Sequence, residues 1–308
     1  MFLRAAVVLS ALSLPLLADS YPLDGYDYTG IRRLEAFRRV QAGELRGRVL
    51  PPGTLLDRNE VQLRLVGVNE RLDITEATPR DEYLQNGLNR IFAGLEGDYS
   101  VALLDISDPA DPRYAGYREG RSYSPGSVGK IVVMVGLFDQ LARLYPEFYD
   151  RSRVLRETRV TADRFVLTDE HVVPFYDIEA NRLFYRQLRI GDVFTLWEWV
   201  DHMISPSSNA AASMVWKQVM LMDHFRRAYP VSSARDSTYF YASSKSQLQE
   251  AAVRVINQPL WDAGISEGEI HQGSFFTGEG KRVIPRTYSS ATPIGLLRFL
   301  LKLEQGQM

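Results

Sequence analysis

A serine and a lysine one helical turn apart are the side chains of this sequence best suited to nucleophilic catalysis. Ser127-Val128-Gly129-Lys130 follows a Pro-Gly turn and runs into an almost wholly apolar stretch, residues 131–138. Residues three apart in a helix share a face, so the Ser127 hydroxyl and the Lys130 amine are expected to meet. Apolar surroundings disfavour the ammonium form and lower the pKa of a lysine, which lets the amine take the serine proton. The pattern predicts Ser127 as nucleophile and Lys130 as its base.

The same four residues also have a plainer interpretation. Ser127 can act as a helix N-cap, and the Lys130 side chain can extend from the start of the helix into water. A lone Ser-x-x-Lys recurs by chance in many chains. A second motif is needed to decide between the two interpretations.

A second cluster of polar residues lies between two predicted helices. Thr195 and Glu198 have capping-box spacing and open a helix that stops at Ser205-Pro206. Ser207-Ser208-Asn209 follows directly, and a run of helix formers begins at Ala210. A hydroxyl in such a loop can relay a proton, and an amide can donate to a substrate carbonyl. Helix capping is the alternative, since Ser and Asn both favour helix starts.

Together these motifs resemble those of the serine β-lactamase and penicillin-binding protein superfamily. A buried strand at 101–106 precedes the Ser-x-x-Lys helix, and Ser-x-Asn follows 80 residues after Ser127. The pattern is most similar to class A β-lactamases, whose second motif is usually Ser-Asp-Asn. Ala291-Thr292-Pro293, followed by regularly spaced leucines, resembles the Thr-Pro-capped helix before the third motif of that class. The resemblance covers roughly residues 80–308.

The resemblance implies a fold, a domain organisation and a set of roles. The fold would be α+β, with a mostly antiparallel sheet flanked by helices and an all-helical subdomain. A serine hydrolase domain at 76–308 would follow a signal peptide at 1–20 and an N-terminal extension at 21–75. Ser127 would be acylated, Lys130 would take part in proton transfer, and Ser207 and Asn209 would line the cleft, the latter as a substrate-binding amide. The ligand would be a β-lactam or a peptidoglycan peptide, with no cofactor and no metal.

Three departures from the class A pattern stand out. Ser208 replaces the usual acid of Ser-Asp-Asn, and no Lys-Thr-Gly follows the Thr-Pro helix. Glu279 lies in the region of the Glu-x-x-Leu-Asn loop but has neither the Leu nor the Asn, so the activator of a deacylating water is unassigned. We expect a chain that lacks its closing C-terminal strands. The alternative is a catalytically impaired relative that binds the cell wall or another protein.

The first residues predict export. One arginine, an apolar run and small residues before a cleavage point after Ser20 form a secretory signal; a retained anchor is the alternative. No later stretch reaches 18 uninterrupted apolar residues, so we expect no integral membrane span after signal removal and a periplasmic protein.

Composition excludes several other functions. With 36 basic and 38 acidic residues the net charge is −2, so no general basic field would hold nucleic acid. The absence of cysteine excludes disulfides and thiolate metal sites. The Asp169-Glu170-His171 cluster is too isolated to predict a metal site.

Periodicity predicts the remaining elements. Apolar residues every three positions over 31–40 predict a helix with basic flanks, either an ordinary solvated face or a surface for an anionic polymer. Alternation over 61–65 predicts a strand, and Thr78 is expected to cap a helix. Residues 114–117 are expected to return as a strand beside 101–106, and 165–189 as a hairpin.

Overall fold

The computed structural model describes residues 25–49, 62–95 and 97–308. Its helices are α1 (Gly25–Thr29), α2 (Arg32–Gln41), α3 (Glu82–Phe92), α4 (Lys130–Leu144), α5 (Phe148–Glu157), α6 (Leu196–Ile204), α7 (Asn209–Phe225), α8 (Ser233–Ala242), α9 (Lys245–Asp262), α10 (Gly278–Val283) and α11 (Pro293–Glu304), with short 3₁₀ turns η2 (Gly126–Gly129), η3 (Arg164–Val166) and η4 (Arg226–Ala228). Its strands are β1 (Val101–Asp105), β2 (Arg113–Tyr117), β3 (Arg159–Thr161), β4 (Val172–Asp177), β5 (Arg182–Gln187), β6 (Val193–Thr195), β7 (Ile270–His271) and β8 (Ser290–Ala291). The signal predicted at 1–20 lies outside the described residues.

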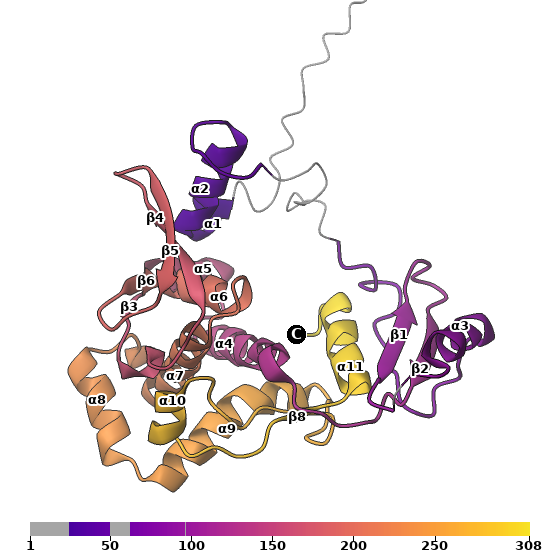
Figure 1. Ribbon diagram of the computed structural model, residues 1–308. Coiled ribbons are helices and arrows are strands. Elements are labelled where there is room, and N and C mark those ends of the chain that lie inside the picture. Colours follow the sequence, from indigo (N-terminus) through magenta and orange to yellow (C-terminus); the bar gives the residue numbers. More distant parts are fainter. Residues whose placement is uncertain (1–24, 50–61, 96) are drawn as a thin grey trace, which may run out of the picture.

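The chain has a mixed α+β architecture with small antiparallel sheets. Each strand of the described ranges has a single strand partner, in the pairs β1–β2, β3–β6, β4–β5 and β7–β8. An isolated bridge also pairs Ala291 of β8 with Tyr123. Helices therefore account for about half of the described residues, and the strands form short pairs between and beside them (Figure 1).

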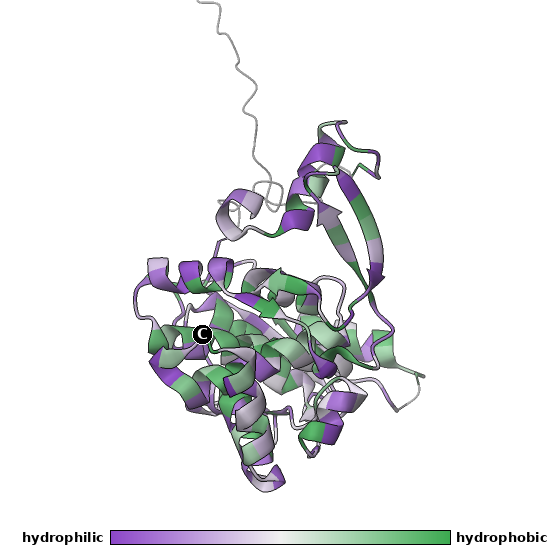
Figure 2. Ribbon diagram, turned by 90° about the vertical axis from the view of Figure 1, so that its left-hand side faces the viewer, coloured by the Kyte–Doolittle hydropathy of each residue, from purple (hydrophilic) through white to green (hydrophobic). Residues whose placement is uncertain are grey.

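The helical part forms the main hydrophobic core. Helix α4 packs against α7 and α9, and α6 packs against α7 (Figure 1). The apolar sequence after Lys130 explains this position, because a helix that is hydrophobic on most sides is stable only when surrounded. Trp199 and Trp216 are fully buried in this core. Hydrophobic positions gather along these central helices, and hydrophilic ones lie on the outer faces (Figure 2).

A second, smaller core lies around the β1–β2 hairpin. The strands pair from Val101 opposite Tyr117 to Asp105 opposite Arg113, which confirms the predicted hairpin. Helix α3 packs on β2 and α11 on β1 (Figure 1). The buried members of this core are Leu65, Ile74, Tyr114, Ile294 and Leu301. Residues of the segment 62–75 therefore pack against the C-terminal helix.

Helix α2 confirms the helix predicted over 31–40 and docks on the helical part. Arg32 Nε donates to Glu198 Oε1 at 2.6 Å, and Arg33 forms an ion pair with Asp201 of α6. The other two arginines of this helix pair with Glu35. Arg32 and Arg33 therefore attach α2 to α6, whereas Arg38 and Arg39 are paired within their own helix.

Two local predictions were wrong. Residues 62–65 form no strand: the chain turns from Arg64, and Leu65 is buried in the smaller core. Thr78 does not cap α3. Its hydroxyl accepts a hydrogen bond from the Thr75 N–H, and Asp81 caps the helix by accepting from the Leu84 N–H. Thr and Asp are both favourable N-cap residues, and the position of the turn in the folded protein decides which of them caps α3.

Three predicted helix starts are confirmed. Thr195 and Glu198 form the capping box of α6, Ser208 caps α7, and Thr292 caps α11 with Pro293 at its first position. The hairpin predicted within 165–189 is formed by β4 and β5. None of the helices in the described ranges combines the length and apolar character needed to cross a bilayer.

A candidate serine–lysine active site

Ser127 and Lys130 meet where η2 leads into α4. The Ser127 side chain is exposed, whereas Lys130 is only 2% exposed. Lys130 Nζ lies 3.1 Å from Ser127 Oγ. The predicted pair is thus within hydrogen-bond distance, with the hydroxyl open to solvent and the amine on the protein side.

Ser207 completes the environment of the Lys130 amine. Lys130 Nζ donates to the Ser207 carbonyl oxygen at 2.5 Å and to Ser207 Oγ at 2.9 Å. With Ser127 Oγ, these acceptors match the three hydrogens of an ammonium group. A neutral amine in the same place has a lone pair, which can accept a proton from either hydroxyl. The geometry suits proton transfer between Ser127, Lys130 and Ser207.

Burial makes the Lys130 amine a better base at moderate pH. It lowers the pKa of Lys130 to about 8, and the negative charge of Asp169 opposes part of that shift. The Phe276 ring adds an apolar wall, with Nζ 5.3 Å from the ring centre. A lysine with this pKa is partly neutral near pH 8, where an exposed lysine is almost fully charged.

The close packing behind the site favours glycine at position 129, because any side chain there would displace the Gln272 amide. A Cβ there would lie 2.1 Å from Oε1 of Gln272, whose side chain is buried and donates through Nε2 to the Ser274 carbonyl. The segment from Gln272 to Phe276 therefore runs beside the start of α4. It forms one wall of the site.

Ser207 has an unusual backbone conformation, with a φ of +59°. It lies in the short connection after α6, and Ser208 directly follows as the N-cap of α7. In this left-handed region the chain turns so that the carbonyl and hydroxyl of one residue both reach Lys130. Such a conformation costs a residue with a Cβ about 1–2 kcal/mol, so the surrounding contacts must hold it.

Asn209 opens α7 and is half-buried. Within the described ranges its side-chain amide makes no hydrogen bond, so its donors and acceptor are free for a ligand. It lies two residues from Ser207 but does not contact Lys130. The predicted substrate-binding role of Asn209 stays a prediction.

Asp169 is the residue of the site that sequence reasoning missed. Its carboxylate is 3% exposed and accepts hydrogen bonds from the Ser208 hydroxyl and the Ala210 N–H, each at 2.8 Å. Burial alone would raise its pKa, but the hydrogen bonds from Ala210, His171 and Ser208 leave it below the ordinary value. In the sequence the only signal was an acidic residue before a hairpin, 38 positions ahead of Ser207.

Glu279 does not contact the serine–lysine pair. Its carboxylate lies 3.0 Å from Arg282 and 3.5 Å from Arg164. Thr277, just before it, caps α10 and donates its hydroxyl to the Phe165 carbonyl. This segment therefore supplies no carboxylate to Lys130.

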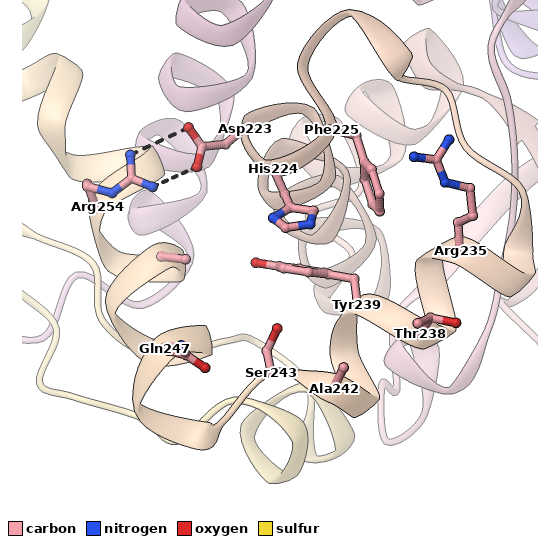
Figure 3. A pocket seen from close by; sticks show the side chains of 11 residues that line it. Asp223, His224, Phe225, Arg235, Thr238, Tyr239, Ala242, Ser243, Gln247 and Arg254 are labelled. Carbon is pink, nitrogen blue, oxygen red and sulfur yellow. Dashed lines mark hydrogen bonds and ion pairs between the residues drawn. The ribbon is translucent and has the colours of Figure 1, made fainter.

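A separate surface hollow of about 600 Å³ lies between the end of α7, α8 and α9 (Figure 3). His224 and Tyr239 face each other there with ring centres 4.3 Å apart, and Asp223 pairs with Arg254. None of the predicted site residues lines it. In the described ranges, no three His, Asp or Glu side chains gather in a way that could hold a metal ion.

No family model matches the chain, and no curated protein matches it.

Proposed function

We propose that the protein is an exported serine acyl-transfer hydrolase of the β-lactamase type. Its substrates would be β-lactams or D-Ala-D-Ala-like amides of peptidoglycan, consumed through an acyl-enzyme on Ser127. One observation carries the proposal. An exposed serine hydroxyl lies 3.1 Å from a buried amine that has no carboxylate within hydrogen-bond distance among the described residues. The resemblance of the motif order to the β-lactamase and penicillin-binding protein superfamily supports it.

Acylation begins with attack by Ser127. Its Oγ forms a bond to the substrate carbonyl carbon while neutral Lys130 takes the hydroxyl proton, and the carbonyl electrons move onto oxygen. The Ser127 N–H makes no hydrogen bond within the described ranges and lies in the first turn of a helix. It can donate to the developing oxyanion, as free N–H groups at helix starts do.

Collapse of the intermediate breaks the carbonyl–nitrogen bond and needs a proton on the leaving nitrogen. Ser207 can donate its own hydroxyl proton and regain one from Lys130, 2.9 Å away. Water then attacks the ester, releases the acid and returns the proton to Ser127. The amide of Asn209 would donate to the bound substrate.

The position of Glu279 favours an enzyme whose acyl-enzyme is hydrolysed slowly. Glu279 is paired with two arginines and does not contact Ser127 or Lys130, so it is not placed to activate water at the acyl-enzyme. A penicillin-binding DD-peptidase stays acylated by penicillin in this way, whereas a β-lactamase turns over. We therefore expect a long-lived penicilloyl-enzyme rather than rapid β-lactam hydrolysis.

A fluorescent penicillin tests the proposal directly. Protein expressed from its natural gene is incubated with the probe, separated under denaturing conditions, and digested to locate the label. Covalent label on Ser127 supports the enzyme, and turnover of a chromogenic β-lactam would select the lactamase version. The absence of any label at Ser127 would leave a non-catalytic wall-binding or interaction protein as the better description.

A further inference from the structure

The loop that brings Ser207 to Lys130 is anchored by a carboxylate from a distant segment. Asp169 Oδ2 accepts from the Ser208 hydroxyl and from the Ala210 N–H, so it contacts the residues on the α7 side of Ser207. Asp169 Oδ1 accepts from the His171 N–H at 3.2 Å and lies 2.6 Å from His171 Nδ1. Both oxygens are thereby fixed.

These contacts stabilise the loop that contains Ser207, whose backbone conformation is strained. Ser207 is left-handed, and a residue with a Cβ persists there only when its neighbours hold it. On the α6 side, the Ser208 N–H donates to the His202 carbonyl at 3.0 Å. On the α7 side, Asp169 holds the loop through its hydrogen bonds with Ser208 and Ala210. A negative charge at the first turn of α7 is also favourable, because free N–H groups point toward it.

Asp169 also acts on Lys130 through its charge. Among the described residues, it is the one charged group whose field opposes the effect of burial on Lys130. His171 is the titratable group that contacts Asp169. The Lys130 amine also lies over the Phe276 ring, which carries no charge. Asp169 does not contact Lys130 directly, so its influence comes through the loop and through space.

We propose that Asp169 is a positioning residue: its buried carboxylate holds the Ser207–Ala210 loop so that the Ser207 carbonyl and hydroxyl reach the Lys130 amine. The effect on catalysis rests on the function proposed above. In this chain the acid expected at the middle of the second motif is replaced by Ser208, and the Ser208 hydroxyl binds Asp169. A carboxylate 39 residues earlier in the chain thus lies against the Ser208 side chain.

Two measurements on one set of variants test this inference. The variants are Asp169→Asn, Asp169→Glu, Ser208→Ala and Glu170→Gln, the last an exposed neighbour that matches the loss of charge without a contact to the loop. The first measurement is the rate of Ser127 acylation by the fluorescent penicillin, taken at pH 9.5 so that the Lys130 amine is mostly neutral. The second is the titration midpoint of Lys130 from ¹³C NMR of labelled lysines. The chain has five lysines, and Lys130→Arg assigns the signal.

Asp169→Asn should slow acylation by about tenfold or more at pH 9.5, because a misplaced loop costs rate even when the base is neutral. It should also move the Lys130 midpoint to lower pH, because an opposite charge is lost. Asp169→Glu should restore part of the rate and the midpoint. Ser208→Ala should slow acylation and leave the midpoint in place, and Glu170→Gln should change neither.

The outcomes separate this inference from the proposed function. If the wild type is not acylated, the proposed function fails, and the backbone amide NMR shifts of residues 207–210 decide the inference: Asp169→Asn and Ser208→Ala should both move them, and Glu170→Gln should not. An Asp169→Asn protein that is acylated within twofold of the wild-type rate, or that leaves these shifts in place, would overturn the positioning role. If Asp169→Asn does not fold, Ser208→Ala decides: acylation at the wild-type rate would show that the Asp169–Ser208 contact does not position the loop.

Discussion

Lys130 Nζ and Ser207 Oγ lie 2.9 Å apart although 77 residues separate them in the sequence. The same amine also donates a hydrogen bond to the Ser207 carbonyl oxygen, so Lys130 Nζ links the start of α4 to the α6–α7 connection. This contact gives Lys130 two serine hydroxyls to exchange protons with.

The rate of acylation should rise with pH through about 8. Burial lowers the pKa of Lys130 to about 8, and the neutral amine is the form that accepts the Ser127 proton. Below this pKa the rate should fall about tenfold per pH unit, because the free-base fraction falls tenfold. Acylation rates measured from pH 6 to 10 check the profile. A rate that is flat across this range, or that declines above pH 8, would contradict the assigned base.

Ser127→Ala should abolish labelling by the fluorescent penicillin, because no other hydroxyl lies in its place at the start of α4. Exposed Ser124, three residues earlier, provides the control, and Ser124→Ala should label like the wild type. Mass spectrometry of digested protein locates the adduct. Label retained in the Ser127→Ala protein would refute the nucleophile.

Lys130→Ala and Lys130→Arg should both suppress acylation by roughly 10²–10⁴-fold, the usual contribution of a positioned base. Arginine keeps the positive charge but does not lose its proton at accessible pH, so it separates a base from a mere cation. Lys302→Arg, in the C-terminal helix, is the matched control and should leave the rate unchanged. Near-normal activity of Lys130→Arg would mean that the charge alone suffices.

The Ser207→Gly and Ser207→Ala proteins should differ in stability but have similar acylation rates. Glycine adopts the left-handed backbone freely, so the Gly variant should be about 1 kcal/mol more stable to urea than the Ala variant. Both lose the hydroxyl and should acylate more slowly than the wild type. Equal urea midpoints for the two variants would show that Ser207 is not strained.

Gly136→Ala should destabilise the protein, whereas Gly87→Ala should stabilise it slightly. A Cβ at Gly136 would lie 2.8 Å from Ile256 Cα and 2.9 Å from the Val255 carbonyl, so α4 and α9 would have to separate. We expect a loss of about 1–3 kcal/mol in the free energy of unfolding. A Cβ at Gly87 in α3 meets nothing within 4 Å, and alanine there should add about 0.5–1 kcal/mol. Thermal unfolding of both variants measures the difference.

Local signals predicted most of the helices and one half of the site. The Ser127–Lys130 spacing, the capping box at Thr195 and the start of a helix after Ser207-Ser208-Asn209 depend on residues within one turn of each other, which a sequence displays directly. The strand expected at 61–65 failed in its described part because alternation alone cannot show that Leu65 packs under α11 as part of a turn.

The rest of the site depends on contacts between distant segments. No pattern in the sequence indicates that Asp169 lies against Ser208, or that Ser207 turns left-handed to reach Lys130. Nor does the sequence show that Glu279 faces two arginines. These features follow from how α4, α6 and α7 pack together, which is set by the whole core.

The left-handed serine has a consequence for laboratory evolution of this protein. At position 207 the backbone favours glycine, while the proposed proton relay needs a hydroxyl. Selection for heat resistance alone should therefore enrich glycine at 207 and produce variants that are more stable but acylate more slowly. Selection for turnover should keep serine there and recruit compensating substitutions elsewhere in the fold.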